Sequence, residues 1–360
     1  MKSPGCSPSE IFAKLEVYLW LGSVKYSKEA VSSLPEEFMP MYEEEEETQR
    51  QLLSVEERRM IPISLSCQDC RYFQLRCHLY QGRGLLAADD DGLSDPFARV
   101  IFSTQCQVTR MLPDTLSPSW CECLLFDRVL LEGTKEQFQQ DPPLIIINIY
   151  DHDKMGSPKP LGRAYAEPEF KTVEQFYEKP RLQFYDVSRG RIPAGELLAA
   201  FELIELDYSA FGEPRLPISV DPQKLTYLDE QRSYVIPEGV QPVLKTFRIE
   251  VLFWGLRELK RVQLFEVERP KVRVEFGGKQ LESEEIQSYK NNPNFKEVVR
   301  YIDVELPEQS YLHPPLTVFV VEHRPFGHLA LVGSHVVQNL MKYLRDHGRE
   351  EEEEEEQKPK

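Results

Sequence analysis

Four aspartates crowd into one short stretch, LAADDDGLSDPF at residues 86–97. Asp89, Asp90, Asp91 and Asp95 repel one another strongly unless water or a cation lies between them. The stretch lies between two segments that read as β-strands. It is therefore either a hydrated turn or one part of a cation site. For Asp90 and Asp91, at the loop tip, we favour the hydrated turn, because Asp and Gly are common turn formers.

A second acidic segment supplies the missing part of such a site. It reads IYDHD at residues 149–153 and follows an apolar run of strand length. Asp151 and Asp153 are two positions apart, so in an extended chain their carboxylates point the same way. Together with Asp89 and Asp95 they form an oxygen-rich set on two loops. Such a set suits Ca²⁺, which takes about 6–8 oxygen ligands.

The elements that must position these loops are strands. Short apolar or alternating segments, separated by Gly, Pro and Asp, indicate an all-β domain of eight antiparallel strands packed as a β-sandwich. We expect strands at residues 72–80, 97–102, 105–111, 120–126, 144–150, 161–166, 182–187 and 196–205.

The same pattern occurs twice in the chain. FQLRCHLYQGRGL at 73–85 matches FRIEVLFWGLREL at 247–259, and DPFARV at 95–100 matches RPKVRV at 269–274. Further matches follow in order at shifts of 171–175 residues. Ordered matches at one period indicate two copies of one domain in tandem.

The loops carry a recognisable pattern. Gly-Leu-Ser-Asp-Pro-Phe, then Thr-Leu-Ser-Pro-Ser-Trp, then Tyr-Asp-His-Asp before Leu-Gly, resembles a C2 domain. Three further segments, GELLAAFELIEL, RIEVLFWGLRELKRV and YKNNPNF, resemble the ferlin family. The resemblance is strongest to its fer-1-like and otoferlin-like members. Ferlins are multi-C2, tail-anchored proteins associated with Ca²⁺-dependent vesicle fusion and membrane repair. The resemblance implies a central C2 segment that lacks the C-terminal membrane anchor.

The resemblance also assigns roles to residues. It implies Ca²⁺ as cofactor, with Asp89, Asp95, Asp151 and Asp153 as metal ligands. C2 domains of this type place a fifth carboxylate three residues before the loop-closing glycine, and here that position holds Lys159. A cation at this place removes a ligand and adds a positive charge. We therefore expect the site to keep one Ca²⁺ position and to weaken or lose a second.

The loop tips suggest how the domain meets a membrane. The resemblance implies that Leu93 and Met155 insert among lipid headgroups once Ca²⁺ has neutralised the loops. The alternative for each is a loop residue folded back onto protein.

The second copy has lost the acidic set. The four ligand positions fall on Gln263, Arg269, Glu322 and Arg324, so we expect no Ca²⁺ binding there. Instead, six cations lie within seventeen residues and form either a solvated strand face or a contact for acidic lipid or protein. They are Arg257, Lys260, Arg261, Arg269, Lys271 and Arg273.

Composition limits the classes of function. The net charge is −17, and the runs Glu43–Glu47 and Glu350–Glu356 contribute strongly to it, which argues against nucleic-acid binding. The seven cysteines are odd in number, and Cys67 and Cys70 form a lone CxxC, so we expect free thiols. No phosphate loop, HExxH or nucleophile elbow occurs, so we expect no enzyme and no small-molecule substrate.

We therefore predict two eight-stranded antiparallel C2-type β-sandwiches in tandem, with acidic disordered linkers. The expected function is Ca²⁺-regulated phospholipid binding in membrane trafficking, vesicle fusion or repair. The expected partners are anionic phospholipid membranes and trafficking proteins, and the expected location is cytoplasmic, as a peripheral membrane protein. The alternative is a Ca²⁺-independent protein scaffold with a vestigial site. The expected parts are an N-terminal segment (1–70), a C2 domain (71–206), a Pro-rich linker (207–242), a degenerate C2-like domain (243–345) and an acidic tail (346–360).

Overall fold

The computed structural model describes residues 70–153, 156–209, 213–228, 231–262, 265–324 and 329–344. The strand expected near residues 14–22, the two glutamate runs, Cys67, Met155 and Gln263 lie outside these ranges. Both copies of the repeat belong to one compact unit, Cys67–Lys360. No helix in the described part of the chain is long and apolar enough to cross a membrane.

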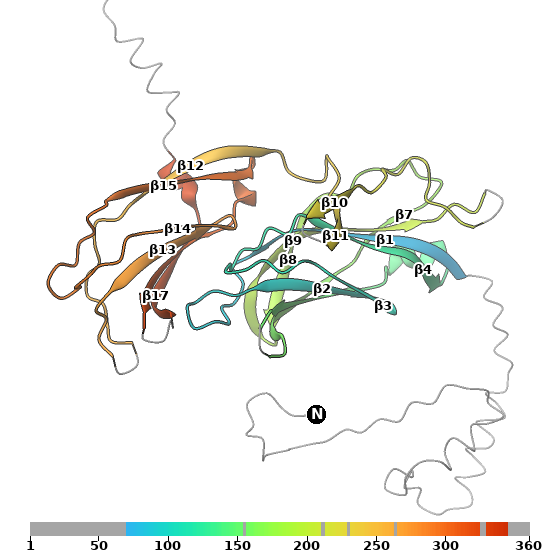
Figure 1. The fold of residues 1–360 in the computed structure, drawn as a ribbon. Helices are drawn as coiled ribbons and strands as arrows, with labels where there is room; N and C mark the ends of the chain where they lie inside the picture. The colour runs from blue at the N-terminus through green and yellow to red at the C-terminus, as the bar shows by residue number, and fades with distance from the viewer. Residues whose placement is uncertain are drawn as a thin grey trace, which may run out of the picture. The chain divides into compact units, whose positions relative to one another are not determined.

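The first copy is the predicted antiparallel β-sandwich (Figure 1). Its strands hydrogen-bond in the order β4-β1-β9-β8-β6-β5-β2-β3. Between β8 and β6 the pairing is reduced to Arg163 with Ser188, so the sheet folds over there and its two halves enclose the core. The bounds are β1 Cys70–Arg83, β2 Pro96–Phe102, β3 Gln105–Val108, β4 Glu122–Glu132, β5 Ile145–Asp151, β6 Lys159–Ala166, β7 Glu169–Lys171, β8 Gln183–Arg189 and β9 Ile192–Glu205.

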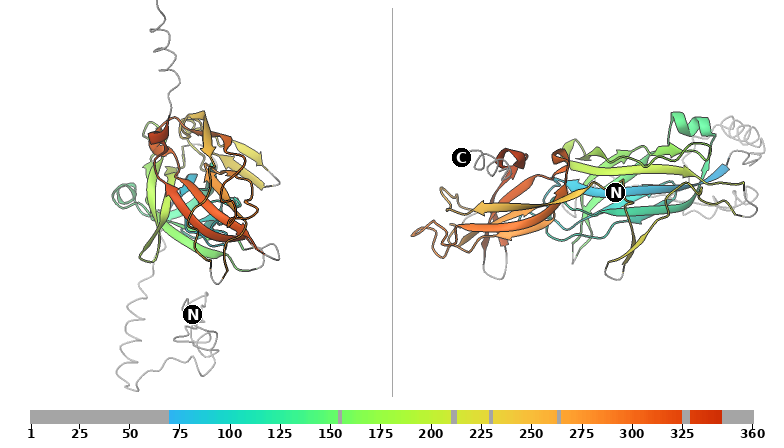
Figure 2. Two further views of the ribbon diagram at one scale, coloured as in Figure 1. Left: turned by 90° about the vertical axis from the view of Figure 1, so that its left-hand side faces the viewer. Right: turned by 90° about the horizontal axis from the view of Figure 1, so that it is seen from above.

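Where one face of a strand is exposed to solvent, buried residues recur at every second position. In β2 buried and half-buried residues alternate along the whole strand, as expected for one face on the core. Strand β1 is instead buried on both faces over most of its length. The core between the layers contains Phe73, Trp120, Ile147 and Phe201. Short helix α3 (Lys135–Gln140) caps one end of this sandwich (Figure 2).

The segment 207–242, expected to be an extended, partly ordered linker, contributes two strands to the fold of the first copy. Its strands β10 (Leu225–Leu228) and β11 (Gln231–Val235) form a hairpin, and β11 pairs with the edge of β4. Arg76 on β1 donates to the carbonyl of Asp221 at 2.9 Å. The segment thus covers the outer face of β1, which explains why that strand is buried on both sides.

Beneath this cover lies a buried polar network. His78 Nε2 is 3.1 Å from a carboxylate oxygen of Glu202, and the hydroxyl of Tyr177 donates to the same carboxylate at 2.9 Å. Burial alone would lower the pKa of His78, but Cys123 and Glu202 raise it to about 9. His78 and Glu202 are both 0% exposed, so neither side chain is accessible to a ligand.

The second copy is smaller. Within its described residues six strands form a two-stranded sheet, β12-β15, and a four-stranded sheet, β14-β13-β16-β17. Eight strands were expected; β8 and β9 have no counterpart among the residues described up to 344. The bounds are β12 Leu244–Leu252, β13 Pro270–Phe276, β14 Lys279–Glu282, β15 Val299–Pro307, β16 Leu316–His323 and β17 Leu329–Val337, with 3₁₀ turns η3 Ser310–Leu312 and η5 Leu340–Tyr343.

Strand registers show that the two copies share one plan. Pro96 pairs with Asp151 in the first copy, and Pro270 pairs with Glu322 in the second. These are the positions that the sequence matches align. The acidic position at the end of β5 therefore has a true counterpart at the end of β16.

Candidate functional site

The centre of the acidic cluster is Asp151, the last residue of β5. Its side chain is 0% exposed. One carboxylate oxygen, Oδ1, accepts the backbone N–H of Asp95 at 2.8 Å, so it ties the β1–β2 loop (residues 84–95) to the end of β5. The other oxygen, Oδ2, is buried and has no hydrogen-bond partner among the described residues.

The ammonium group of Lys159 occupies the middle of the cluster. Lys159 opens β6 and pairs with Asp151 across the two strands, which brings their side chains together. Its Nζ lies 3.9 Å from Asp151 Oδ2, 3.9 Å from Asp89 Oδ1 and 3.6 Å from Asp153 Oδ2. One protein cation thus contacts three of the four predicted ligands.

A single ammonium neutralises this cluster only in part. Burial and the neighbouring Asp151 raise the pKa of Asp89, while Lys159 acts in the opposite direction without cancelling them. Burial is the largest cause of the raised pKa, and repulsion from Asp151, Asp95 and Asp91 adds to it, so the Lys159 ammonium does not fully offset these effects.

Asp95, the fourth predicted ligand, is used differently. Its carboxylate accepts the backbone N–H of Asp114 at 2.8 Å and so orders the loop before β4. Its own N–H and carbonyl are also engaged, by Asp151 and by the N–H of His152. Asp95 therefore acts as a junction between three loops in this structure.

As arranged, the side chains do not fit a metal ion. Among the residues the structure describes, no group of three or more His, Cys, Asp or Glu side chains is disposed to hold one. Three of the four carboxylates lie 3.6–3.9 Å from the Lys159 ammonium. The role of the aspartates as Ca²⁺ ligands therefore stays a prediction.

The tip of the β1–β2 loop is covered by the second copy. Leu93 is 1% exposed and packs with Phe319 and Val321 of β16, with Leu331 of β17 at the margin. The Leu331 N–H donates to the carbonyl of Asp90 at 3.1 Å. The predicted membrane contact of Leu93 needs a free tip, whereas the structure places this side chain in an apolar contact between the copies. Insertion into lipid would require that contact to open.

Ion pairs and hydrogen bonds surround this apolar contact. Asp91 pairs with Arg273 of β13 at 3.0 Å, and both side chains are largely buried. Thr115 donates to Glu275 at 2.7 Å, and Glu275 is 0% exposed. Burial raises the pKa of Glu275 to about 7, with Thr115 opposing the effect. The Asp91–Arg273 pair fixes the acidic loop against the second copy, and the Thr115–Glu275 hydrogen bond fixes the segment before β4.

The second copy repeats the structural half of the cluster without the acidic excess. Glu322, the counterpart of Asp151, accepts the backbone N–H groups of Glu268 and Arg269 at 2.6 and 3.0 Å. Its other oxygen forms an ion pair with Arg324 Nε at 3.1 Å. Arg324 stands where the first copy has Asp153. A carboxylate at this strand end therefore serves to tie the loop in both copies, a role that sequence patterns did not reveal.

The six cations of the second copy do not form one free basic face. Lys271 and Arg273 share Glu282, at 2.8 and 2.9 Å, and both are mostly buried. Arg261 pairs with Glu266 at 2.8 Å. The guanidinium of Arg257 donates to the carbonyls of Leu256 and Pro293 and to the side chain of Asn294, Arg269 lies 3.9 Å from Glu285, and Lys260 is exposed.

The fold and the loops define a C2-domain protein. The sequence profile of the family described as "C2 domain" matches residues 73–179, which span β1 to β7. In the first copy, the two acidic loops, β1–β2 and β5–β6, meet at one end of the sandwich.

Similar proteins of known sequence identify the family within this class. Fer-1-like protein 4 of Mus musculus is 50% identical over 343 residues, which cover 95% of this chain and 16% of that protein. Myoferlin of Homo sapiens is 34% identical over 274 residues, 76% of this chain and 13% of that protein. The chain belongs to the ferlin family, and it spans about one sixth or less of the length of these relatives.

Among solved structures, the two tandem C2 domains of extended synaptotagmin 2 match 77% of this chain, and the match covers 82% of that chain. The sequence identity is 17% and the TM-score is 0.29.

Proposed function

We propose that this chain is a membrane-associated C2 module that works without Ca²⁺, because Lys159 supplies the cation internally. The observation that carries the proposal is the position of the Lys159 ammonium, within 4 Å of three aspartates. In a Ca²⁺-switched domain the acidic loops become neutral only when the metal binds. Here part of that neutralisation is permanent.

The contact between the copies supports the same proposal. The tip of the β1–β2 loop carries the apolar residue expected to insert into lipid, and Leu93 is buried against Phe319 and Val321. A loop held in this way does not respond freely to a bound cation. The proposed partners are therefore anionic membranes or trafficking proteins met by other surfaces, with the chain acting as a peripheral component of a ferlin-type protein.

A second candidate rests on a different observation. The Oδ2 atom of Asp151 is buried without a hydrogen bond, and the pKa of Asp89 is raised even with Lys159 present. Excess negative charge favours a divalent cation over a monovalent one. Ca²⁺-regulated phospholipid binding at high Ca²⁺ concentration is therefore the second candidate, with displacement of Lys159 as its cost.

Liposome co-sedimentation of the full chain tests both candidates. Vesicles containing phosphatidylserine are mixed with the protein in Ca²⁺ or in chelator, beside phosphatidylcholine vesicles. The proposed function predicts equal pelleting with and without Ca²⁺. Pelleting that requires Ca²⁺ and disappears in the Asp95→Asn, Asp151→Asn double variant supports the second candidate instead.

Absence of pelleting under all conditions contradicts direct lipid binding and leaves protein scaffolding, which affinity capture with tagged chain then tests. The control for the aspartate variants is Asp186→Asn, the same change at an exposed aspartate of β8, outside the acidic cluster.

A further inference from the structure

Strand β12 of the second copy has an open edge. In the first copy β1 lies between β4 and β9, whereas β12 pairs with β15 alone among the strands that the structure describes. Every second residue of β12 therefore directs its N–H and C=O groups away from β15, where no described strand receives them. An edge of this kind is a template for pairing with another strand.

The same edge leaves the core of the second copy partly uncovered. Phe247, Ile249 and Val251 of β12 pack against that core, yet all three remain only half-buried. Their counterparts in β1, at the positions 73, 75 and 77 that the sequence repeat aligns, are 0% exposed. In the first copy β9 pairs with β1 along all three positions. A strand beside β12 would cover the apolar side chains in the same way.

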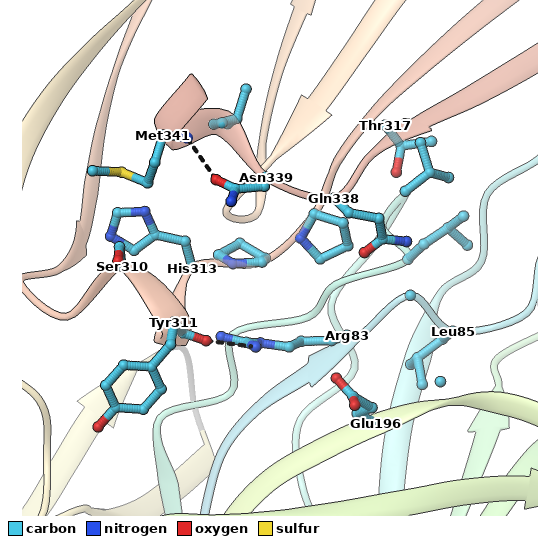
Figure 3. Close-up of a pocket in the computed structure, with 17 residues that line it drawn as sticks. Arg83, Leu85, Glu196, Ser310, Tyr311, His313, Thr317, Gln338, Asn339 and Met341 are labelled. Atoms are coloured by element: carbon cyan, nitrogen blue, oxygen red, sulfur yellow. Dashed lines mark hydrogen bonds between the residues drawn. The ribbon is translucent and has the colours of Figure 1, made fainter. Parts of the chain in front are cut away.

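The chain that follows β17 adds one apolar contact to this core but no strand. It turns at Asn339, whose side chain accepts the N–H of Met341 at 2.9 Å and caps the 3₁₀ turn η5 (Figure 3). Leu340, within this turn, packs against the core of the second copy. A 3₁₀ turn presents no strand edge, so the backbone groups on the open side of β12 stay available.

The sequence of β12 is complementary to β12 of a second molecule in one antiparallel register. Two identical strands pair antiparallel about a two-fold axis. With Ile249 opposite Ile249, the apolar positions 247 and 251 meet on the core side, and Arg248 lies opposite Glu250 on the outer side. An axis at position 248 or 250 would instead bring two arginines or two glutamates together. A slip of one residue would place core-facing side chains opposite outward-facing ones.

Both charged groups are available for this pairing. Arg248 uses Nε and Nη2 to bind Asp303 of β15, at 2.8 and 3.0 Å, and its Nη1 donates to no described residue. The guanidinium stacks on Tyr301, with 4.3 Å from Cζ to the ring centroid, which holds it on the outer face. Glu250 is exposed and forms no ion pair within the described ranges. Opposite charges directly across two strands stabilise their pairing.

We propose that β12 is a dimerisation edge, at which two molecules of the chain pair antiparallel with Ile249 at the two-fold axis. The pairing joins β15 and β12 of each molecule into one four-stranded sheet. It covers both half-buried core edges and forms two contacts between Arg248 of one molecule and Glu250 of the other. The dimer uses neither the acidic cluster nor a membrane, so it does not depend on the proposed function.

Sedimentation equilibrium of the full chain measures the association. The wild type should form a species of twice the chain mass of 42.0 kDa, in a concentration-dependent way. A chain that remains monomeric at about 100 µM overturns the proposal. Growth beyond the dimer overturns the closed two-fold arrangement, since one edge used twice leaves no further site.

Charge reversal tests the contacts across the axis. Glu250→Arg changes an exposed side chain and places an arginine opposite Arg248, so it should weaken dimerisation at least about tenfold. Glu305→Arg is the matched control, the same change at an exposed glutamate of the neighbouring strand β15, and should leave the dimer unchanged. Equal dissociation constants for the wild type and Glu250→Arg overturn the proposed edge.

Cysteine substitution tests the register without relying on charge. In the proposed dimer the two side chains at position 249 are opposite each other, close enough for a disulfide. Ile249→Cys should therefore give a covalent dimer on mild oxidation, above the level seen with the wild-type cysteines. Phe247→Cys should not, because position 247 of the second molecule lies four residues further along the strand. Equal cross-linking of the two variants overturns the register.

Discussion

Replacing Lys159 with methionine should raise the Ca²⁺ affinity of the first copy and destabilise it when Ca²⁺ is absent. The magnitude follows from the three carboxylate contacts. Asp89 and Asp153 are partly exposed, with side chains 42% and 35% accessible, so solvent screens their attraction to the ammonium. Each such pair is worth about 0.5 kcal/mol. The pair with Asp151, whose side chain is 0% exposed, contributes more, about 1–2 kcal/mol.

The three contacts together contribute about 2–3 kcal/mol. This free energy affects both the stability without Ca²⁺ and the affinity for Ca²⁺. Without Ca²⁺ the variant loses this amount of unfolding free energy. With Ca²⁺ the wild-type protein must give up the same contacts before the metal enters, so its affinity should be about 30- to 150-fold weaker than that of Lys159→Met.

Isothermal titration of the full chain with CaCl₂ measures the affinity, and urea unfolding in chelator measures the stability. Lys159→Arg keeps the charge and should behave like wild type, and Lys296→Met is the control for loss of a lysine elsewhere. Equal Ca²⁺ affinity in wild type and Lys159→Met, with both folded, would refute the proposal that the ammonium opposes Ca²⁺ binding.

Three further outcomes follow from the described contacts. Leu93→Ala should cost about 2–4 kcal/mol of unfolding free energy, because it empties the contact between the copies; a cost below about 0.5 kcal/mol in urea unfolding would show that the contact does not form in solution. Because the folded-state pKa of Glu275 is raised to about 7, its protonated form stabilises the protein below the ordinary pKa of 4.5, and this contribution is lost as pH rises through 7. This contribution is up to about 3 kcal/mol. The melting temperature of Glu275→Gln should therefore change less between pH 5 and 8 than that of the wild type. Parallel pH profiles of the two proteins would contradict this. Gly195→Ala should lower the melting temperature, since Gly195 has φ of +110° and a Cβ there would lie 2.5 Å from the carbonyl oxygen of Arg83; an unchanged melting temperature in calorimetry would count against it.

The all-β class and the tandem repeat could be predicted from the sequence because each depends on local periodicity and order. Alternating burial in β2 follows directly from its alternating residues. The match of DPFARV with RPKVRV proved to align β2 with β13, and the paired positions Pro96 and Pro270 agree in register. The same local patterns placed Asp151 at a strand end facing a loop.

Segment 207–242 shows where local patterns were not enough. Its prolines indicated an extended linker, yet β11 pairs with β4 and covers the outer face of β1. Edge pairing of this kind depends on a strand about one hundred residues earlier in the chain, whose unpaired edge no local window reveals. Similarly, the burial of Leu93 depends on Phe319, more than two hundred residues away.

By itself the sequence determined which residues carry charge and which loops they occupy, including the lysine at position 159. Only the tertiary structure decided where that charge acts. Pairing of Asp151 with Lys159 across β5 and β6 brings the ammonium to the three carboxylates. The packing of the second copy decides that the loop tip faces protein. Both outcomes depend on distances between residues remote in sequence, and electrostatic and apolar interactions are set by those distances and by burial.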